Sequence, residues 1–232
     1  MNRTLNVARV HLKFDVPKPM WLMLLMSGTM LAPNYPRIVS ALLAVSLLSS
    51  VVGFIRENRA EEFLETLPVG RRDIIGGHMV TLAAIETIYI LCMAVFDVIA
   101  CALPFFDTSI AASAVGMTGT VAFFGVVFMT YGVFNLVFTV IYRRNGRTPS
   151  SLALGLIAAL IVCAVPYGIV EVLAQTVAAV GKAFTSFSVE ALPVQFAVLF
   201  VGIALFVALS ALGVFLSDKG GDAKKNVSKV NG

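Results

Sequence analysis

The feature that most constrains this chain is a series of long apolar runs bounded by charged residues. The clearest run covers residues 38–55, lies between Arg37 and Arg56, and is interrupted only by Gly53 and by serines. An α-helix rises about 1.5 Å per residue and the hydrocarbon core of a bilayer is about 30 Å thick, so a spanning helix needs about 20 mostly apolar residues. Serine hydroxyls can bond to carbonyls of their own helix. The run therefore predicts a transmembrane helix.

The composition extends this prediction to the whole chain. Hydrophobic residues make up 59% of the 232 residues and charged residues 13%, whereas an average soluble domain has about 45–50% and about 25%. A soluble core of this size cannot bury that apolar surface, but a bilayer accepts helices that are apolar on every side. The sequence predicts an all-α integral membrane protein with six transmembrane helices, at about residues 16–32, 38–55, 79–103, 116–141, 150–170 and 194–216.

The basic residues are distributed over alternate connections. Fifteen of the 17 Lys and Arg residues fall before the first span or at its start (Lys18), between the second and third, between the fourth and fifth, or after the sixth. The other two are Arg37 and Lys182. Cytoplasmic connections are enriched in Lys and Arg. This pattern predicts an even number of spans with both termini in the cytoplasm, and it is the reason for including the short first span.

Three segments are not predicted to span. An N-terminal interfacial helix at about residues 2–14 has an apolar face that includes Leu5 and Leu12, with basic residues on its other faces. Residues 171–192, on the outer side, are too polar to span and too apolar for a free loop. Residues 217–232 are rich in Lys, Gly and Asn and are predicted to be a disordered cytoplasmic tail.

The cytoplasmic connection between the second and third spans, residues 56–73, has the most regular pattern of apolar and charged residues. Apolar residues at i, i+3, i+4 and i+7 form one stripe and glutamates cover the other faces, which predicts a short amphipathic helix. Pro68 and Gly70 end this helix, and a new helix begins near Arg71 and leads into the third span. The alternative is an ordinary linker resting on the membrane. Helices on anionic leaflets are usually basic, so the acidic face favours a protein partner.

This segment resembles the first cytoplasmic loop of the membrane subunits of ABC exporters of the second type, the ABC-2 type permease family. That loop has an acidic helix, Leu-Pro, a small residue and Arg before the next span. The same order appears here in residues 61–65, Leu67-Pro68, Val69-Gly70 and Arg71-Arg72. The six spans, the N-terminal interfacial helix and the outer segment resemble the family too.

The resemblance implies that the loop is a coupling helix, which binds a cytoplasmic P-loop ATPase subunit, and that residues 171–192 are outer re-entrant helices. Phe63, Leu64 and Leu67 would be the buried anchors of the coupling helix. The full set of predicted partner-binding residues is Glu61, Glu62, Phe63, Leu64, Glu65, Leu67, Pro68, Arg71 and Arg72. A second permease copy or a homologue would complete a dimer of six-span subunits.

The implied function is export of a hydrophobic or amphipathic substrate, such as a peptide, a lipid or a drug-like molecule, across a bacterial plasma membrane. The chain lacks the G-x-x-x-x-G-K-[ST] phosphate loop. We therefore expect no enzyme activity and no cofactor on this chain, with ATP and magnesium bound by the partner ATPase. Its other contacts would be membrane lipid, with no nucleic acid.

Two acidic residues lie inside the third span. Glu86 and Asp97 are eleven residues apart, about three helical turns, so they fall on a similar face at different depths. Carboxylates in hydrocarbon are costly and normally face a bundle interior or a water-filled path. They are candidates for the substrate path or a proton relay. The structural alternative is a carboxyl bonded to a neighbouring helix or, for Asp97, a position close to the outer head groups.

Two other functions remain alternatives. A proton-coupled secondary transporter would use Glu86 and Asp97 and would need no ATPase. An intramembrane enzyme is suggested by the Glu61-Glu62 pair, but this pair lies in a surface loop. The chain has two histidines, His11 and His78, neither in a span core, so no catalytic residue and no metal site are predicted.

Overall fold

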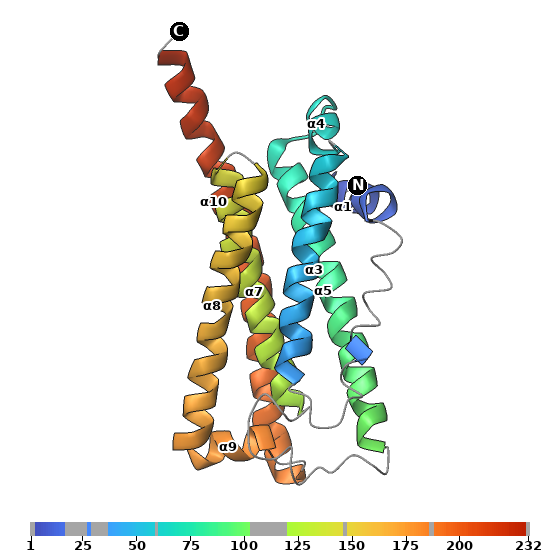
Figure 1. The fold of residues 1–232 in the computed structure, drawn as a ribbon, viewed down its shortest axis with the longest axis vertical. Coiled ribbons are helices and arrows are strands. Elements are labelled where there is room, and N and C mark those ends of the chain that lie inside the picture. Colours follow the sequence, from blue (N-terminus) through green and yellow to red (C-terminus); the bar gives the residue numbers. More distant parts are fainter. Residues whose placement is uncertain are drawn as a thin grey trace.

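The computed structural model describes residues 3–16, 27–28, 37–58, 60–102, 120–145, 148–185 and 188–230, and every regular element in these ranges is helical. Five long helices stand side by side (Figure 1): α3 (Arg37–Glu57), α5 (Arg71–Ala102), α7 (Val121–Arg144), α8 (Pro149–Thr176) and α10 (Leu192–Val230). The shorter elements are α1 (Arg3–Val10), a π-helical turn at His11–Asp15, α4 (Ala60–Glu65), α9 (Ala178–Thr185) and a 3₁₀ turn at Val189–Ala191.

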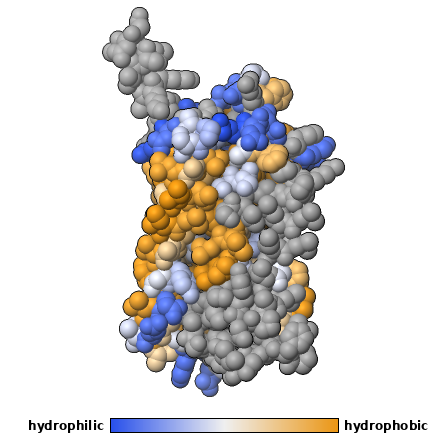
Figure 2. All heavy atoms as spheres, viewed as in Figure 1, coloured by the Kyte–Doolittle hydropathy of each residue, from blue (hydrophilic) through white to orange (hydrophobic). Residues whose placement is uncertain are grey.

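The five long helices are each long and apolar enough to cross a membrane. They correspond to the last five predicted spans, and α5 continues without a break from Arg71 into the third span, as the sequence predicts. The first predicted span, at residues 16–32, lies for the most part outside the described residues and stays a prediction. Apolar side chains cover the face formed by α8, between hydrophilic groups at the two ends of the molecule (Figure 2).

The two ends of the bundle carry different elements. The N-terminal helix α1, the short α4, the α7–α8 connection and the C-terminal end of α10 lie at one end, here called the α4 end (Figure 1). The start of α3 and α9 lie at the other end, here called the α9 end. Arg37 and Lys182 are thus at the α9 end, and Arg71 and Arg143 are at the α4 end. This separation agrees with the alternation of basic residues along the chain.

Helix α7 lies at the centre of the bundle and contacts α3, α5, α8, α9 and α10. The rings of Phe134 and Phe138 stack with their centroids 5.1 Å apart, and Phe138 stacks on Tyr142 at 5.8 Å. On another face glycines bring α7 and α10 into backbone contact. A Cβ built on Gly125 would lie 2.6 Å from the Val198 carbonyl oxygen, and one on Gly202 would overlap the Gly125 carbonyl. Small residues allow such close approach between membrane helices.

Replacing Gly202 with alanine is expected to force α7 and α10 apart and to lower the free energy of unfolding by about 1–3 kcal/mol, because the added methyl group overlaps backbone rather than a movable side chain. Thermal unfolding of the purified protein in detergent measures the change. Gly168→Ala is the matched control, since a Cβ on Gly168 meets nothing within 4 Å. Equal thermal midpoints for the two variants would contradict this account of the α7–α10 contact.

Two segments differ from the sequence prediction in extent. Helix α10 continues to Val230, past the start of the tail that the sequence predicts to be disordered from residue 217, and the disorder itself stays a prediction. In the outer segment, α8 extends to Thr176 and α9 follows. Phe184 is buried against Ala122 and Val126 of α7, so this segment packs onto the bundle.

Candidate functional site

The loop at the α4 end is a compact helix followed by a tight turn. Helix α4 ends at Glu65, and Thr66 stabilises the end through a hydrogen bond from Oγ1 to the Phe63 carbonyl at 2.7 Å. Backbone bonds from Leu67 to Leu64 and from Val69 to Leu67 close the turn that contains Pro68. The amides of Asp73 and Ile74 then donate to the Gly70 carbonyl and start α5. The predicted order of helix, turn and second helix is confirmed.

The apolar stripe of α4 is divided between two environments. Leu64 is 4% exposed and packs with Val7 of α1 and Ile74 of α5, whereas Phe63 is 63% exposed and Leu67 40% exposed. In this structure Leu64 holds the loop to its own chain, and the prediction that these three residues are anchors for a partner stays a prediction. The stripe faces inward at Leu64 because α1 packs there. Glu62, Glu65 and Pro68 are exposed, and the side chain of Glu61 lies outside what the structure describes.

Helix α1 packs against Leu64 of the loop and against the first turns of α5. Thr4 Oγ1 donates to Asp73 Oδ1 at 2.8 Å, and Thr81 Oγ1 on α5 donates to the Ala8 carbonyl at 3.3 Å. A Cβ on Gly77 would overlap the Val7 side chain, so α1 and α5 approach as closely as a glycine allows. The buried face of this helix, at Val7 and Ala8, contacts protein. The predicted N-terminal helix thus braces α4 and the first turns of α5.

Basic and aromatic side chains join α5 to its neighbours at the same end. Arg71 and Arg72 are exposed in the first turn of α5. Nearly two turns further along α5, His78 Nδ1 lies 3.2 Å from Nη2 of Arg143 on α7. The centroid of the His78 ring lies 6.0 Å from that of the His11 ring. These contacts join α5, which follows the loop, to α1 and α7.

The acid Glu86 lies in the core of the bundle. It is fully buried, and Asn135 of α7 donates from Nδ2 to Glu86 Oε2 at 2.8 Å and to Ser210 Oγ of α10 at 3.0 Å. Glu86 Oε1 and Asn135 Oδ1 have no hydrogen-bond partner among the described residues. This cluster links α5, α7 and α10 by polar contacts. It fits the structural alternative for Glu86 and leaves one carboxyl oxygen unused.

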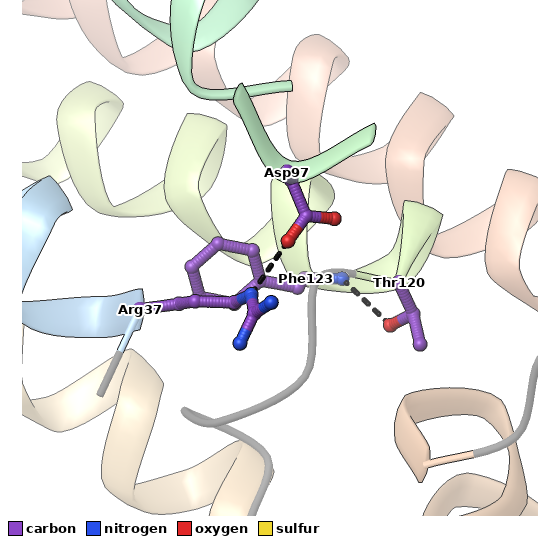
Figure 3. A network of polar contacts seen from close by, with 4 residues as sticks. All are labelled: Arg37, Asp97, Thr120 and Phe123. Atoms are coloured by element: carbon purple, nitrogen blue, oxygen red, sulfur yellow. Dashed lines mark hydrogen bonds and ion pairs between the residues drawn. The ribbon is translucent and has the colours of Figure 1, made fainter. Parts of the chain in front are cut away.

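The second acid, Asp97, forms a buried ion pair near the α9 end (Figure 3). Arg37 Nε, at the start of α3, donates to Asp97 Oδ1 at 2.6 Å, and both side chains are about 95% buried. Thr120 lies nearby and caps α7 by accepting a hydrogen bond from the Phe123 amide at 3.4 Å. Glu86 and Asp97 therefore do not meet, and each is bonded to a different neighbouring helix.

Three residues of these polar contacts were not predicted from the sequence. Asn135 stands inside an apolar run, and an intramembrane polar residue of this kind normally faces the bundle interior, so it carried a usable signal. Arg37 counted as a residue of the outer connection, and Ser210 resembles the many other serines of the spans. Their pairing depends on which helices are neighbours, and periodicity along one helix does not encode that.

Comparisons with known proteins gave one match. Residues 18–219 match the family model described as "ABC-2 family transporter protein", which covers most of the chain and every long helix at least in part. Searches of the curated proteins and of the solved structures found no match.

Proposed function

We propose that this chain, which belongs to the ABC-2 transporter family, is the multi-pass permease subunit of an ABC exporter. Membership of this family implies association with an ABC ATPase subunit. The observation that carries the proposal is the loop at the α4 end, where Phe63 and Leu67 are exposed while Leu64 and α1 hold the helix in place. Exposed aromatic and aliphatic side chains on a braced helix are suitable anchors for a partner's groove.

In this proposal the ATPase receives Phe63 and Leu67, and the acidic residues of α4 set orientation at the rim of the interface. Movement of the ATPase on binding and hydrolysing ATP would push α4. Because Leu64 packs against Val7 and Ile74, the push would reach α1 and the first turn of α5 together. A rigid α5 would then carry the displacement along the bundle. ATP and magnesium would be bound by the partner, and this chain would supply no ATPase site.

The substrate and assembly are proposed on the same basis. The exposed apolar face of α8 fits contact with lipid or with a second copy or homologue of the permease. A largely apolar bundle favours a hydrophobic or amphipathic cargo over a small ion. The excess of basic residues at the α4 end supports a cytoplasmic location for that end in this proposal, in a bacterial cell, with export directed toward the α9 end.

Co-purification tests the proposal directly. The chain would be tagged at its C-terminus, extracted from native membranes in a mild detergent and analysed by mass spectrometry. A P-loop ATPase is expected in the complex. An intact complex that contains no ATPase would argue against the exporter function.

One observation supports a second candidate, a proton-coupled secondary transporter. Glu86 Oε1 is buried without a hydrogen-bond partner in the described part of the chain, and a proton on the carboxyl would provide it with a donor for Asn135 Oδ1 or another acceptor. Against this candidate, Glu86 and Asp97 are bonded to different helices and are not connected by any described chain of polar contacts.

Replacing Glu86 with glutamine separates the two candidates. Glutamine keeps an oxygen that can accept from Asn135, so we expect a change of less than about 1 kcal/mol in the free energy of unfolding and export rates equal to wild type at every pH. Transport into inverted membrane vesicles over a range of pH measures the effect. A variant that transports but has lost the wild-type pH dependence would favour proton coupling through Glu86.

A further inference from the structure

A cavity opens between α5 and α10 at the α4 end of the bundle. Its volume is about 430 Å³, and Thr4 of α1 is among its lining residues. The walls are mainly apolar. They are formed by Met79, Val80 and Ala83 of α5 and by Val207, Ala211 and Val214 of α10. Several of these side chains are exposed along the outside of the bundle, so the cavity is open to the side rather than enclosed. It contains neither Phe63 nor Leu67 and is distinct from the proposed ATPase interface.

The dimensions of this cavity fit one leaflet of a membrane. Its lining on α5 runs from Arg72 to Ala83, which at 1.5 Å per residue is about 16 Å along the helix. Half of a hydrocarbon core of about 30 Å is about 15 Å. The charged residues of the lining, Arg72 and Asp73, lie in the first turn of α5, next to α4. The apolar residues line the rest of the cavity. A groove with this polarity matches a molecule with a polar head and an apolar chain.

The rim of the cavity carries one cation and one carboxylate. Among the described lining residues, Arg72 is exposed and makes no hydrogen bond or ion pair within the described part of the chain. Asp73 accepts from Thr4 through Oδ1 and retains acceptor capacity for a second donor. A guanidinium binds phosphate oxygens with two parallel hydrogen bonds. A carboxylate beside it repels a wholly anionic head group and attracts an ammonium group.

We infer that the cavity between α5 and α10 binds a phospholipid with an ammonium head group, such as phosphatidylethanolamine. The phosphate contacts Arg72, the ammonium group contacts Asp73, and one acyl chain lies between Val80 and Val207. The site assigns Arg72 to lipid rather than to the ATPase. The assignment of this site to the cytoplasmic leaflet rests on the proposed function. The lipid binding itself does not.

Native mass spectrometry of the detergent-purified complex tests the inference, with phosphatidylethanolamine and phosphatidylglycerol of identical acyl chains as probes. Wild type is expected to bind phosphatidylethanolamine more tightly. Arg72→Ala is expected to weaken binding of both lipids about tenfold, because both lose the phosphate contact. Asp73→Asn keeps an acceptor for Thr4 and is expected to reduce the preference for phosphatidylethanolamine about threefold to fivefold, as for an exposed ion pair. Ala211→Phe, which fills the groove, is expected to weaken both lipids.

The control is Arg9→Ala, which removes an exposed arginine of α1 that does not line the cavity. Equal losses for Arg9→Ala and Arg72→Ala would overturn the inference, since they would indicate attraction by the general positive charge of this end. Equal binding of the two lipids by wild type would overturn the assignment of Asp73. The lipid measurement can also be made on the chain alone, so a missing ATPase would contradict the proposed function without affecting this result.

Discussion

Replacing Phe63 and Leu67 together with aspartate is expected to release the ATPase and abolish transport while the chain stays folded and inserted. Both side chains are exposed at the α4 end, so the substitutions add no charge to the interior of the bundle. In the complex, the new carboxylates would be buried in an apolar groove without partners. Buried interface anchors commonly contribute about 2 kcal/mol or more each, so the affinity for the ATPase should fall at least hundredfold. Co-purification and substrate export from cells measure the two effects.

The control for this variant is Ser150→Asp. It adds a negative charge at the same end of the bundle, in the exposed first turn of α8, where a helix N-terminus tolerates an acid. Wild-type association and export are expected for it. Retained export in the Phe63 and Leu67 double variant, with normal amounts of protein in the membrane, would remove the coupling function from α4.

The sequence predicted α4 well because an amphipathic pattern and a Leu-Pro turn are local signals. It did not predict which member of the stripe faces inward. Leu64 is buried by Val7, a residue of a different helix, and this contact depends on how α1 crosses α5. The close approach at Gly77 allows that crossing. Periodicity predicts which residues form the apolar face of an amphipathic helix. The tertiary structure is needed to tell which of these residues pack against the same chain and which stay exposed for another protein.

The long helices were predicted from the sequence because apolar runs are also a local signal. The residues at which these helices end were not predicted. Apolar runs indicate where hydrocarbon can surround a helix, so α3 and α7 lie close to the predicted spans. Helix α8 extends to Thr176, past its predicted end, and α10 extends past Ser217. Hydropathy reports the solvent around a helix, while the end of a helix is determined by its caps and by neighbouring contacts.

The second large effect is expected at the ion pair between Arg37 and Asp97. Replacing Asp97 with alanine removes the carboxylate from a guanidinium that is about 95% buried. Removing one partner of a buried pair costs about 3–5 kcal/mol, because the remaining charge has lost its compensation. We expect the variant to unfold at a clearly lower temperature in detergent and to be less abundant in the membrane. The start of α3 and the C-terminal part of α5 would lose the ion pair that joins them.

A double-mutant cycle identifies the cause of that loss. Arg37→Met with Asp97→Leu replaces both charges by apolar side chains, and such replacements of a buried pair are often neutral or stabilising. The single variants of this cycle are Arg37→Met and Asp97→Leu, each of which removes one member of the pair. The double variant is expected to recover most of the stability lost in either of them, which gives a large coupling energy. If the losses of the single variants simply add, the two side chains do not depend on each other. A positive coupling together with normal export would show that Asp97 stabilises the bundle and is not needed in a substrate path, since the apolar pair would have removed its charge without removing transport.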